Sequence, residues 1–429
     1  MESARAHALP PWAAPAAVLA LAVITHLAGA PLLGDYASRV LMDVMIAVTL
    51  AVSLNIVNGL AGQFSLGHAA FFAIGGYTAA AVTYYASLAL FDHTAALAWS
   101  QGGGYATQQA LFVVAAIVGG VVAAAAGWLV GLPSLRLRGD YLAMVTLGFG
   151  EILRVLLQQT ETQLYSRQEV RDAPAGAFLP PPVGGAVGFI GVPKLTNLFW
   201  ATLAAGVCVV FAWRLKRSTF GRAMIAIREN EIAAESMGVN VTRLKAWAFV
   251  LAAFFAGVAG CLYAHETGQQ LTPTDGGFNR SVDVVIMVVL GGLGSISGAI
   301  TAATLLTIAN EWLRDPGAAL YALPGGWDLH VWHLAAAALA IRLLAWPHKR
   351  LKAAIVWTIA IVALETLRQL SERYGVDLGQ FRVILYALVL ILVMILRPTG
   401  LFGTSEITDL PAMRRGRRVT PERGLEVVS

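Results

Sequence analysis

The sequence predicts an all-α fold: a polytopic integral membrane helix bundle with about ten transmembrane helices and at least one broken or re-entrant segment. First, 57% of the 429 residues are hydrophobic and only 13% are charged, whereas soluble domains carry about 25% charged residues. Second, the chain contains about ten apolar stretches near the roughly 20 residues that a spanning helix needs. Because lipid cannot satisfy exposed backbone groups, these stretches favour helices over an open sheet.

The predicted spans follow one another with short polar connections. In chain order they are Trp12–Leu33, Val40–Val57, Leu66–Leu90, Leu111–Gly131, Tyr141–Leu157, Leu198–Trp213, Ala246–Tyr263, Val282–Trp312, Val331–Trp346, Ala353–Leu367 and Val383–Leu396. The first is longer than a signal-peptide core and lacks a convincing cationic start, so we expect it to be retained as a helix.

Basic residues predict the orientation of the helices. They cluster at Arg136 and Arg138, in the loop 214–245, at Lys349–Lys352 and at Arg414–Arg418. By the positive-inside rule, these four clusters and both termini face the cytoplasm. The net charge of +5 is therefore explained by topology, and no nucleic-acid partner is expected.

The segment Val282–Trp312 must enter and leave on the same side, because otherwise the later basic loops would face outward. It contains Gly291, Gly292 and Gly294, and glycine interrupts helices and permits close backbone approach. We expect the helix to break there.

The two halves of the chain share a glycine spacing. Gly59, Gly62 and Ser65 are spaced as G-x-x-G-x-x-S, and Gly291, Gly294 and Ser297 repeat this spacing. Matching glycine-interrupted segments are typical of repeats that flank a translocation path. Small residues also mediate ordinary helix packing, so the spacing leaves that alternative open.

The segment Asn55–Tyr77 places several polar side chains among apolar residues. Each needs a partner or a water-lined cavity. Either they line the pathway or they form hydrogen bonds between packed helices. The pathway residues predicted here and elsewhere are Asn58, Gly62, Gln63, Ser65, Gly67, His68, Gly75, Glu151, Gly291, Gly294 and Ser297.

Four stretches in this order carry a specific resemblance: Asn55–Tyr77, Leu135–Arg154, Phe220–Gly238, and Val285–Ile300 with Leu396–Phe402. Together they are similar to the branched-chain amino acid permease family of ABC importers, in its LivM-type branch. The resemblance implies a second homologous permease subunit, two ATP-binding cassette subunits, a periplasmic substrate-binding protein and surrounding membrane lipid as partners. It places the chain in a bacterial inner membrane.

The cytoplasmic stretch Ser218–Thr242 is too polar to span, and its apolar residues can form one face of a short helix ended by Gly238. Such a helix could lie on the membrane surface. In the family it resembles the coupling helix that docks on the ATPase. The coupling residues that this implies are Gly221, Arg222, Arg228, Glu229, Asn230, Glu231, Ala233, Ala234 and Gly238.

Glu151 is a charged residue about 16 Å along a predicted spanning helix, close to the middle of the bilayer. Arg154 lies on the same face, three residues on. The pair either meets substrate or holds two helices together, and we expect the structural role.

The chain contains no G-x-x-x-x-G-K-[ST] phosphate loop, no H-E-x-x-H sequence and no Cys/His ligand cluster. We therefore expect no enzyme, no metal and no cofactor bound by this chain, with ATP used by the partner subunits. A secondary transporter and a channel are the competing classes, but neither needs a docking helix for a motor. Urea or amide permeases of the same family remain alternatives for the substrate.

Two departures from the family bear on the substrate and the domain division. The external segment Arg171–Gly185 lacks the usual Gly/Asn-rich stretch, and residues near 315–362 look inserted. The predicted division is 1–36, an extension with the first helix; 37–214, the first permease half; 215–245, the coupling loop; 246–403, the second half; and 404–429, a basic cytoplasmic tail.

Overall fold

The computed structural model describes residues 13–91, 105–134, 140–174, 181–266, 270–314, 321–323 and 327–329, and the single residues 391, 400, 403 and 406. The long elements are α1 (Ala13–Asn55), α2 (His68–Phe91), α4 (Tyr105–Ser134), α5 (Asp140–Gln158), α7 (Leu198–Arg217), α10 (Val241–Ala264), α11 (Phe278–Gly291) and α12 (Ile296–Arg314). The short elements are η1 (Ile56–Leu60), α6 (Arg167–Asp172), η3 (Gly185–Val187), α8 (Thr219–Glu229), α9 (Glu231–Ser236), η4 (Pro273–Gly276), β1 (Tyr321–Leu323) and β2 (Trp327–Leu329).

The helix α1 reverses direction at Gly34, whose backbone is non-helical with φ 73° and ψ 171°. Before the reversal, Thr25 donates a hydrogen bond to Thr202 of α7 at 3.2 Å. After it, the Cys208 thiol of α7 contacts the Thr49 carbonyl oxygen. Both halves of α1 therefore pack on α7 as two separate helices, of which Gly34–Leu60 has the length of a span and Ala13–Gly29 is a shorter apolar helix. This agrees with the separate predicted spans Trp12–Leu33 and Val40–Val57.

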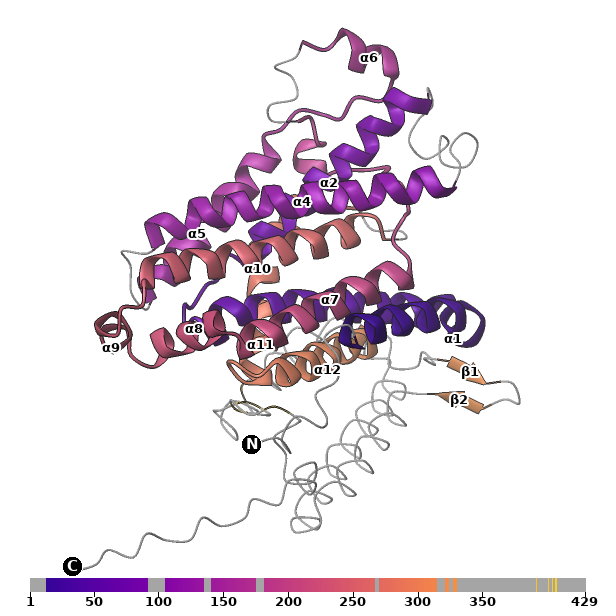
Figure 1. Ribbon diagram of the computed structural model, residues 1–429. Helices are drawn as coiled ribbons and strands as arrows, with labels where there is room; N and C mark the ends of the chain where they lie inside the picture. Colours follow the sequence, from indigo (N-terminus) through magenta and orange to yellow (C-terminus); the bar gives the residue numbers. More distant parts are fainter. Residues whose placement is uncertain are drawn as a thin grey trace, which may run out of the picture.

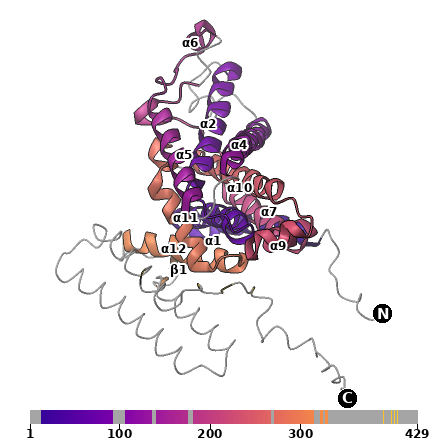
Figure 2. The same cartoon turned by 90° about the vertical axis from the view of Figure 1, so that its left-hand side faces the viewer.

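The centre of the bundle is the packing of α2, α4 and α10, where α4 and α10 run side by side (Figures 1 and 2). Small residues allow the backbones to touch. A side chain at Gly75 would collide with the backbone of Gly257, and one at Gly260 would collide with the Phe72 carbonyl oxygen. Close approach through glycine is the packing mode of helices that cannot rely on the hydrophobic effect within lipid.

The predicted break in Val282–Trp312 is present. α11 ends at Gly291, α12 begins at Ile296, and both Gly292 and Gly294 have positive φ, 110° and 84°. The two helices pack on each other and on α1, and α12 forms the lower edge of the bundle in Figure 1. Glycine is required here because other residues rarely adopt this backbone conformation.

The all-α membrane bundle is confirmed. Within the described residues, five helices have the length and hydropathy to cross a membrane: Gly34–Leu60, Ala106–Leu132, Tyr141–Gln158, Leu198–Arg217 and Val241–Ala264. The total of about ten is not established, because the predicted spans Val331–Trp346 and Ala353–Leu367, and nearly all of Val383–Leu396, lie outside the described residues.

A small departure from the all-α prediction falls in the segment 315–362. There β1 and β2 form an antiparallel pair with Tyr321 opposite Leu329. The predicted division into permease halves stays a prediction.

We predict that Gly260→Ala lowers the melting temperature, because its Cβ would collide with the Phe72 carbonyl oxygen. Overpacking of this kind costs about 1–3 kcal/mol. The matched control is Gly148→Ala in α5, where an added Cβ meets nothing within 4 Å. That change should be neutral or stabilising by up to about 1 kcal/mol. Equal melting temperatures for the two variants in detergent would contradict the packing argument.

Candidate coupling and translocation site

The two glycine motifs meet each other in space. The chain leaves α1 through the π-helical turn η1, and Gly62 then takes a φ of 68°. A side chain at Gly59 would collide with the backbone nitrogen of Gly294. The second glycine of each motif, Gly62 and Gly294, has positive φ, whereas Gly59 and Gly291 do not. The motifs thus share their spacing and the positive φ of the second glycine, but they differ between the glycines, because Gly292 has a φ of 110° whereas its counterpart Leu60 lies in the π-helical turn.

Asn55 holds the two motifs together. Its Oδ1 accepts a hydrogen bond from the Gly294 backbone nitrogen at 2.9 Å, and its Nδ2 donates to the Ser295 carbonyl oxygen at 3.2 Å. Asn55 is 1% exposed, so these bonds satisfy polar groups that burial would otherwise leave unpaired. The turn between α11 and α12 is therefore fixed against the end of α1.

Arg228 of α8 inserts where the glycine motifs meet. Its Nη1 donates to the Gly59 carbonyl oxygen at 2.8 Å. An added Cβ at Gly62 would lie 2.5 Å from the Arg228 Cγ, and one at Gly294 would lie 2.6 Å from its Nη1. Only glycine leaves room for the arginine at both positions. On its outer side, Arg228 pairs with Glu229 at 2.6 Å.

A second cation secures the same turn. Lys216 at the end of α7 donates to the Gly294 carbonyl oxygen at 2.6 Å and to Glu406 Oε1 at 2.5 Å. Glu406 also accepts hydrogen bonds from the backbone nitrogens of Ile296 and Ser297, both at 3.0 Å. Burial tends to raise the pKa of Glu406, but the hydrogen bonds from Lys216, Ser297 and Ile296 outweigh it and lower the pKa below its ordinary value. The carboxylate thus caps α12, where the helix dipole favours a negative charge.

The predicted coupling stretch contains two helices rather than one. α8 ends at Glu229, and Asn230 begins α9 by accepting a hydrogen bond from the Ala233 nitrogen at 3.0 Å. Gly238 then ends α9 with a φ of 81°. Asparagine is a favoured N-cap because its side chain replaces a missing helix acceptor.

The break at Asn230 divides the predicted apolar face. Met224 and Ile227 are buried, whereas Ile232 and Met237 are 69% and 84% exposed. Among the other predicted coupling residues, Gly221 and Ala234 are buried and Arg222 and Ala233 are exposed. Glu231 pairs with Lys245 of α10 at 2.9 Å. The pair α8–α9 therefore presents a mixed, partly apolar surface to the outside of the bundle.

The predicted pathway residues around the start of α2 lie where α2, α5 and α11 meet. The Leu66 nitrogen donates to Thr146 of α5, and the Ala69 nitrogen donates to Ser281 of α11. His68 is buried and shares a 2.8 Å hydrogen bond with Ser53. A side chain at Gly67 would collide with the Thr146 carbonyl oxygen. His68, Gly67 and Gly75 thus have packing roles here.

Three neighbouring polar side chains are buried with atoms that lack partners among the described residues. Asn58 Oδ1 accepts a hydrogen bond from the Ser65 nitrogen at 3.1 Å. The Asn58 Nδ2, Gln63 Oε1 and Ser65 Oγ atoms make no hydrogen bond within that part of the chain. Such groups are costly to leave unpaired, which is the signal expected of a segment that meets water, substrate or another subunit.

Glu151 and Arg154 form an ion pair at 2.7 Å and are each partly exposed. Glu151 also accepts a hydrogen bond from the Phe278 nitrogen at 3.1 Å, at the start of α11. The carboxylate therefore joins α5 to α11. This geometry agrees with the structural role expected for Glu151, whose function stays a prediction.

Charged residues that the sequence reasoning missed gather between α1, α10 and α11. Arg39 lies 3.8 Å from the buried Glu266, and Asp43 and Arg280 are their electrostatic neighbours. Arg280 also lies over the Tyr263 ring, 4.9 Å from its centroid. Asp43, inside the predicted span Val40–Val57, was the available signal, because charges within spans are rarely incidental.

Within the described residues, no group of three or more His, Cys, Asp or Glu residues could hold a metal ion. The groups at the glycine junction are instead backbone amides and carbonyls, two cations and one carboxylate. Through these contacts the position of α8 is linked to that of the α11–α12 turn.

Comparison with curated proteins identifies relatives among transport permeases. The chain is 37% identical over 293 residues to the high-affinity branched-chain amino acid transport system permease protein LivM of Salmonella typhimurium, covering 63% of this chain and 62% of that protein. Identity to the LivM protein of Escherichia coli is 36% over the same shares. The chain thus spans less than two thirds of the length of these relatives.

A more distant match is the autoinducer 2 import system permease protein LsrC of Klebsiella pneumoniae, 34% identical over 144 residues, with 33% of this chain and 39% of that protein covered. No solved structure matches.

The model of the family described as branched-chain amino acid transport system / permease component matches residues 36–325. This range includes both glycine motifs, Arg228 and the charged group around Glu266. Because it covers more than half of the chain, the protein belongs to this branched-chain amino acid permease family.

Proposed function

We propose that this chain is the membrane-spanning permease subunit of an ABC importer for branched-chain or similar hydrophobic amino acids. The family and the apolar helices indicate a multi-pass inner-membrane protein. Its relatives are transport permeases, which are not enzymes in themselves. ATP is then hydrolysed by two separate cassette subunits, and a periplasmic protein delivers the substrate. We also propose that the chain assembles with a second homologous permease subunit and that both of its termini face the cytoplasm.

One observation carries the mechanism: the hydrogen bond from Arg228 Nη1 to the Gly59 carbonyl oxygen. It joins α8, on the side where an ATPase would dock, to the backbone junction of the two broken segments. The exposed Ile232 and Met237 supply apolar anchors for the docking partner. Movement of α8 and α9 is then passed through Arg228 to η1 and the α11–α12 turn. A secondary carrier or a channel needs no such connection.

Arg228→Met should uncouple ATP hydrolysis from uptake. Methionine retains an apolar stem beside Gly62 but cannot donate to Gly59. Uptake per ATP hydrolysed, measured with the full complex in proteoliposomes, should fall at least about tenfold, corresponding to about 1.4 kcal/mol. The control is Arg217→Met, the same exchange at the end of α7, where the guanidinium group lies 3.8 Å from the Trp213 ring centroid and makes no bond to Gly59. An unchanged ratio in Arg228→Met would contradict the proposed connection.

The two motif glycines should behave alike. Gly62→Ala and Gly294→Ala both force an L-residue into positive φ and both displace Arg228, so each should reduce uptake strongly. Gly34→Ala separates the two causes, because Gly34 also has positive φ but an added Cβ meets nothing within 4 Å. We expect Gly34→Ala to lower stability by about 1–3 kcal/mol, because its backbone conformation is nearly restricted to glycine, without uncoupling. If only one motif glycine matters in the uptake assay, the symmetry of the two motifs is not functional.

A double-mutant cycle tests Glu151 and Arg154. Glu151→Gln removes the charge but retains an acceptor for the Phe278 nitrogen, whereas Glu151→Ala removes both. We expect the alanine variant to melt at the lower temperature. Glu151→Gln and Arg154→Gln together should cost less than the sum of the single losses, by about 0.5–3 kcal/mol. Additive losses would show that the ion pair does not contribute, and normal melting with altered substrate preference would instead assign Glu151 to the pathway.

A further inference from the structure

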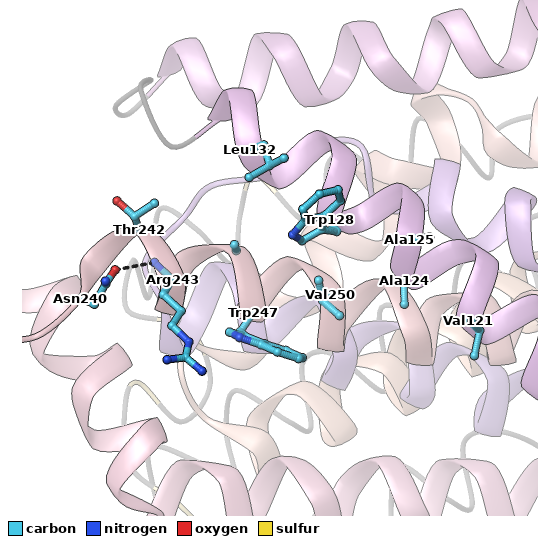
Figure 3. Close-up of a pocket in the computed structure, with 11 residues that line it drawn as sticks. Val121, Ala124, Ala125, Trp128, Leu132, Asn240, Thr242, Arg243, Trp247 and Val250 are labelled. Atoms are coloured by element: carbon cyan, nitrogen blue, oxygen red, sulfur yellow. Dashed lines mark hydrogen bonds between the residues drawn. The ribbon is translucent and has the colours of Figure 1, made fainter.

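A groove of ≈ 920 Å³ lies between the second half of α4 and the first half of α10. The residues along it are drawn in Figure 3. Its floor includes Ala124, Ala125 and Ala246, and Trp128 and Trp247 stand on the two helices beside it. At one end lie Thr242 and Arg243. The volume falls within the range of about 300–1,000 Å³ that is usual for small-molecule sites.

Close packing of the two helices creates this groove. An added Cβ at Gly127 would lie 2.9 Å from the Phe249 carbonyl oxygen, so the backbones approach closely behind the groove. Because the alanines that line the groove have short side chains, they leave open space between Trp128 and Trp247. Trp128 and Trp247 are 54% and 43% exposed, and such rings prefer the membrane–water interface.

The groove has the length of one leaflet. From Leu132 to Val121 it follows α4 for eleven residues, about 16 Å at 1.5 Å per residue. Half of the hydrocarbon core is about 15 Å. Only four residues separate the end of α9 from the start of α10, so the end of the groove at Arg243 lies on the side of the coupling helices. By the proposed orientation this is the cytoplasmic leaflet.

The chemistry of the cytoplasmic end favours an anion. Arg243 is exposed, and among the ion pairs of the described residues it has no acidic partner. Its guanidinium group lies near Trp247 in Figure 3. Arginine binds phosphate with two parallel hydrogen bonds, and the cytoplasmic leaflet is the one that carries anionic lipids.

We propose that this groove binds one anionic phospholipid of the inner leaflet, with its phosphate on Arg243 and an acyl chain along Ala124 and Ala125 between the two tryptophans. The positive charge of Arg243, the length of the groove along α4 and its floor of small apolar residues together favour this occupant. A protein helix could cover the same apolar floor, but binding it would not use the positive charge of Arg243, the one cation among the described residues that line the groove. The lipid would contact α10 close to the point where it leaves the coupling helices, so its loss would loosen this end of α10.

The test uses the full-length chain, purified from membranes together with its partner subunits and analysed by native mass spectrometry after exchange into vesicles of phosphatidylcholine with or without phosphatidylglycerol. Wild-type protein should retain phosphatidylglycerol in preference to phosphatidylcholine. Arg243→Gln should reduce the retained phosphatidylglycerol roughly fivefold, the usual effect of one basic residue near an anionic surface. Arg217→Gln is the matched control, because Arg217 is an exposed arginine beside a tryptophan, 3.8 Å from the Trp213 ring centroid, but does not line the groove.

A second pair of variants tests the groove itself. In Ala125→Phe the larger ring should fill part of the groove and displace the lipid. Ala125 is exposed, so the ring should be tolerated without disturbing buried packing. Val114→Phe, at an exposed position three turns earlier on α4, should not displace the lipid.

Three results would overturn the proposal: equal retention of both lipids by wild-type protein, unchanged retention in Arg243→Gln, or equal behaviour of the two phenylalanine variants. If Ala125→Phe instead released a second permease subunit without changing bound lipid, the groove would be a protein interface and the lipid assignment would be wrong.

Discussion

The absence of side chains at Gly59, Gly62 and Gly294 allows the end of α1 and the α11–α12 turn to meet backbone to backbone and leaves room for the Arg228 side chain of α8. Gly59 touches Gly294, and Arg228 fills the space beside Gly62. Any Cβ at these positions would separate the end of α1 from the α11–α12 turn or expel the arginine. Because lipid offers no hydrophobic force between helices, such contacts must come from close packing and hydrogen bonds. The connection between the coupling helices and the broken segments depends on this geometry.

The buried polar groups around the junction fall into two classes. Asn55, Lys216 and Glu406 have all found partners, so they fix the backbone of the turn. Asn58, Gln63 and Ser65 keep atoms without partners in the described part of the molecule. Satisfied networks give rigidity, whereas unsatisfied buried groups indicate that something else completes the site. The segment around η1 therefore has a backbone fixed by hydrogen bonds and, beside it, buried polar atoms that are available to bind water, substrate or another subunit.

The coupling helices α8 and α9 connect the glycine junction with α10, which is one of the two helices that form the groove. α8 and α9 contact the junction through Arg228 and contact α10 through the Glu231–Lys245 ion pair. α10 in turn packs closely against α4 at Gly257 and against α2 at Gly260. Displacement of the coupling helices would therefore be transmitted both to the broken segments and to α10, and the lipid proposed at Arg243 would contact a helix that moves with them.

Composition and spacing alone determined the membrane bundle, the break at Gly291–Gly294, the polar segment after Asn55 and the family resemblance, because hydropathy, charge and glycine act locally. Tertiary structure alone decided that the two glycine motifs touch, that Arg228 reaches Gly59 across 169 residues, and that Glu406 caps α12. Only the structure shows that the coupling stretch breaks at Asn230 and that Ile232 and Met237 are exposed. It also shows that Arg39, Asp43, Glu266 and Arg280 lie close to one another. These contacts join segments distant in sequence, and their register is set by how the helices pack, which no local pattern encodes.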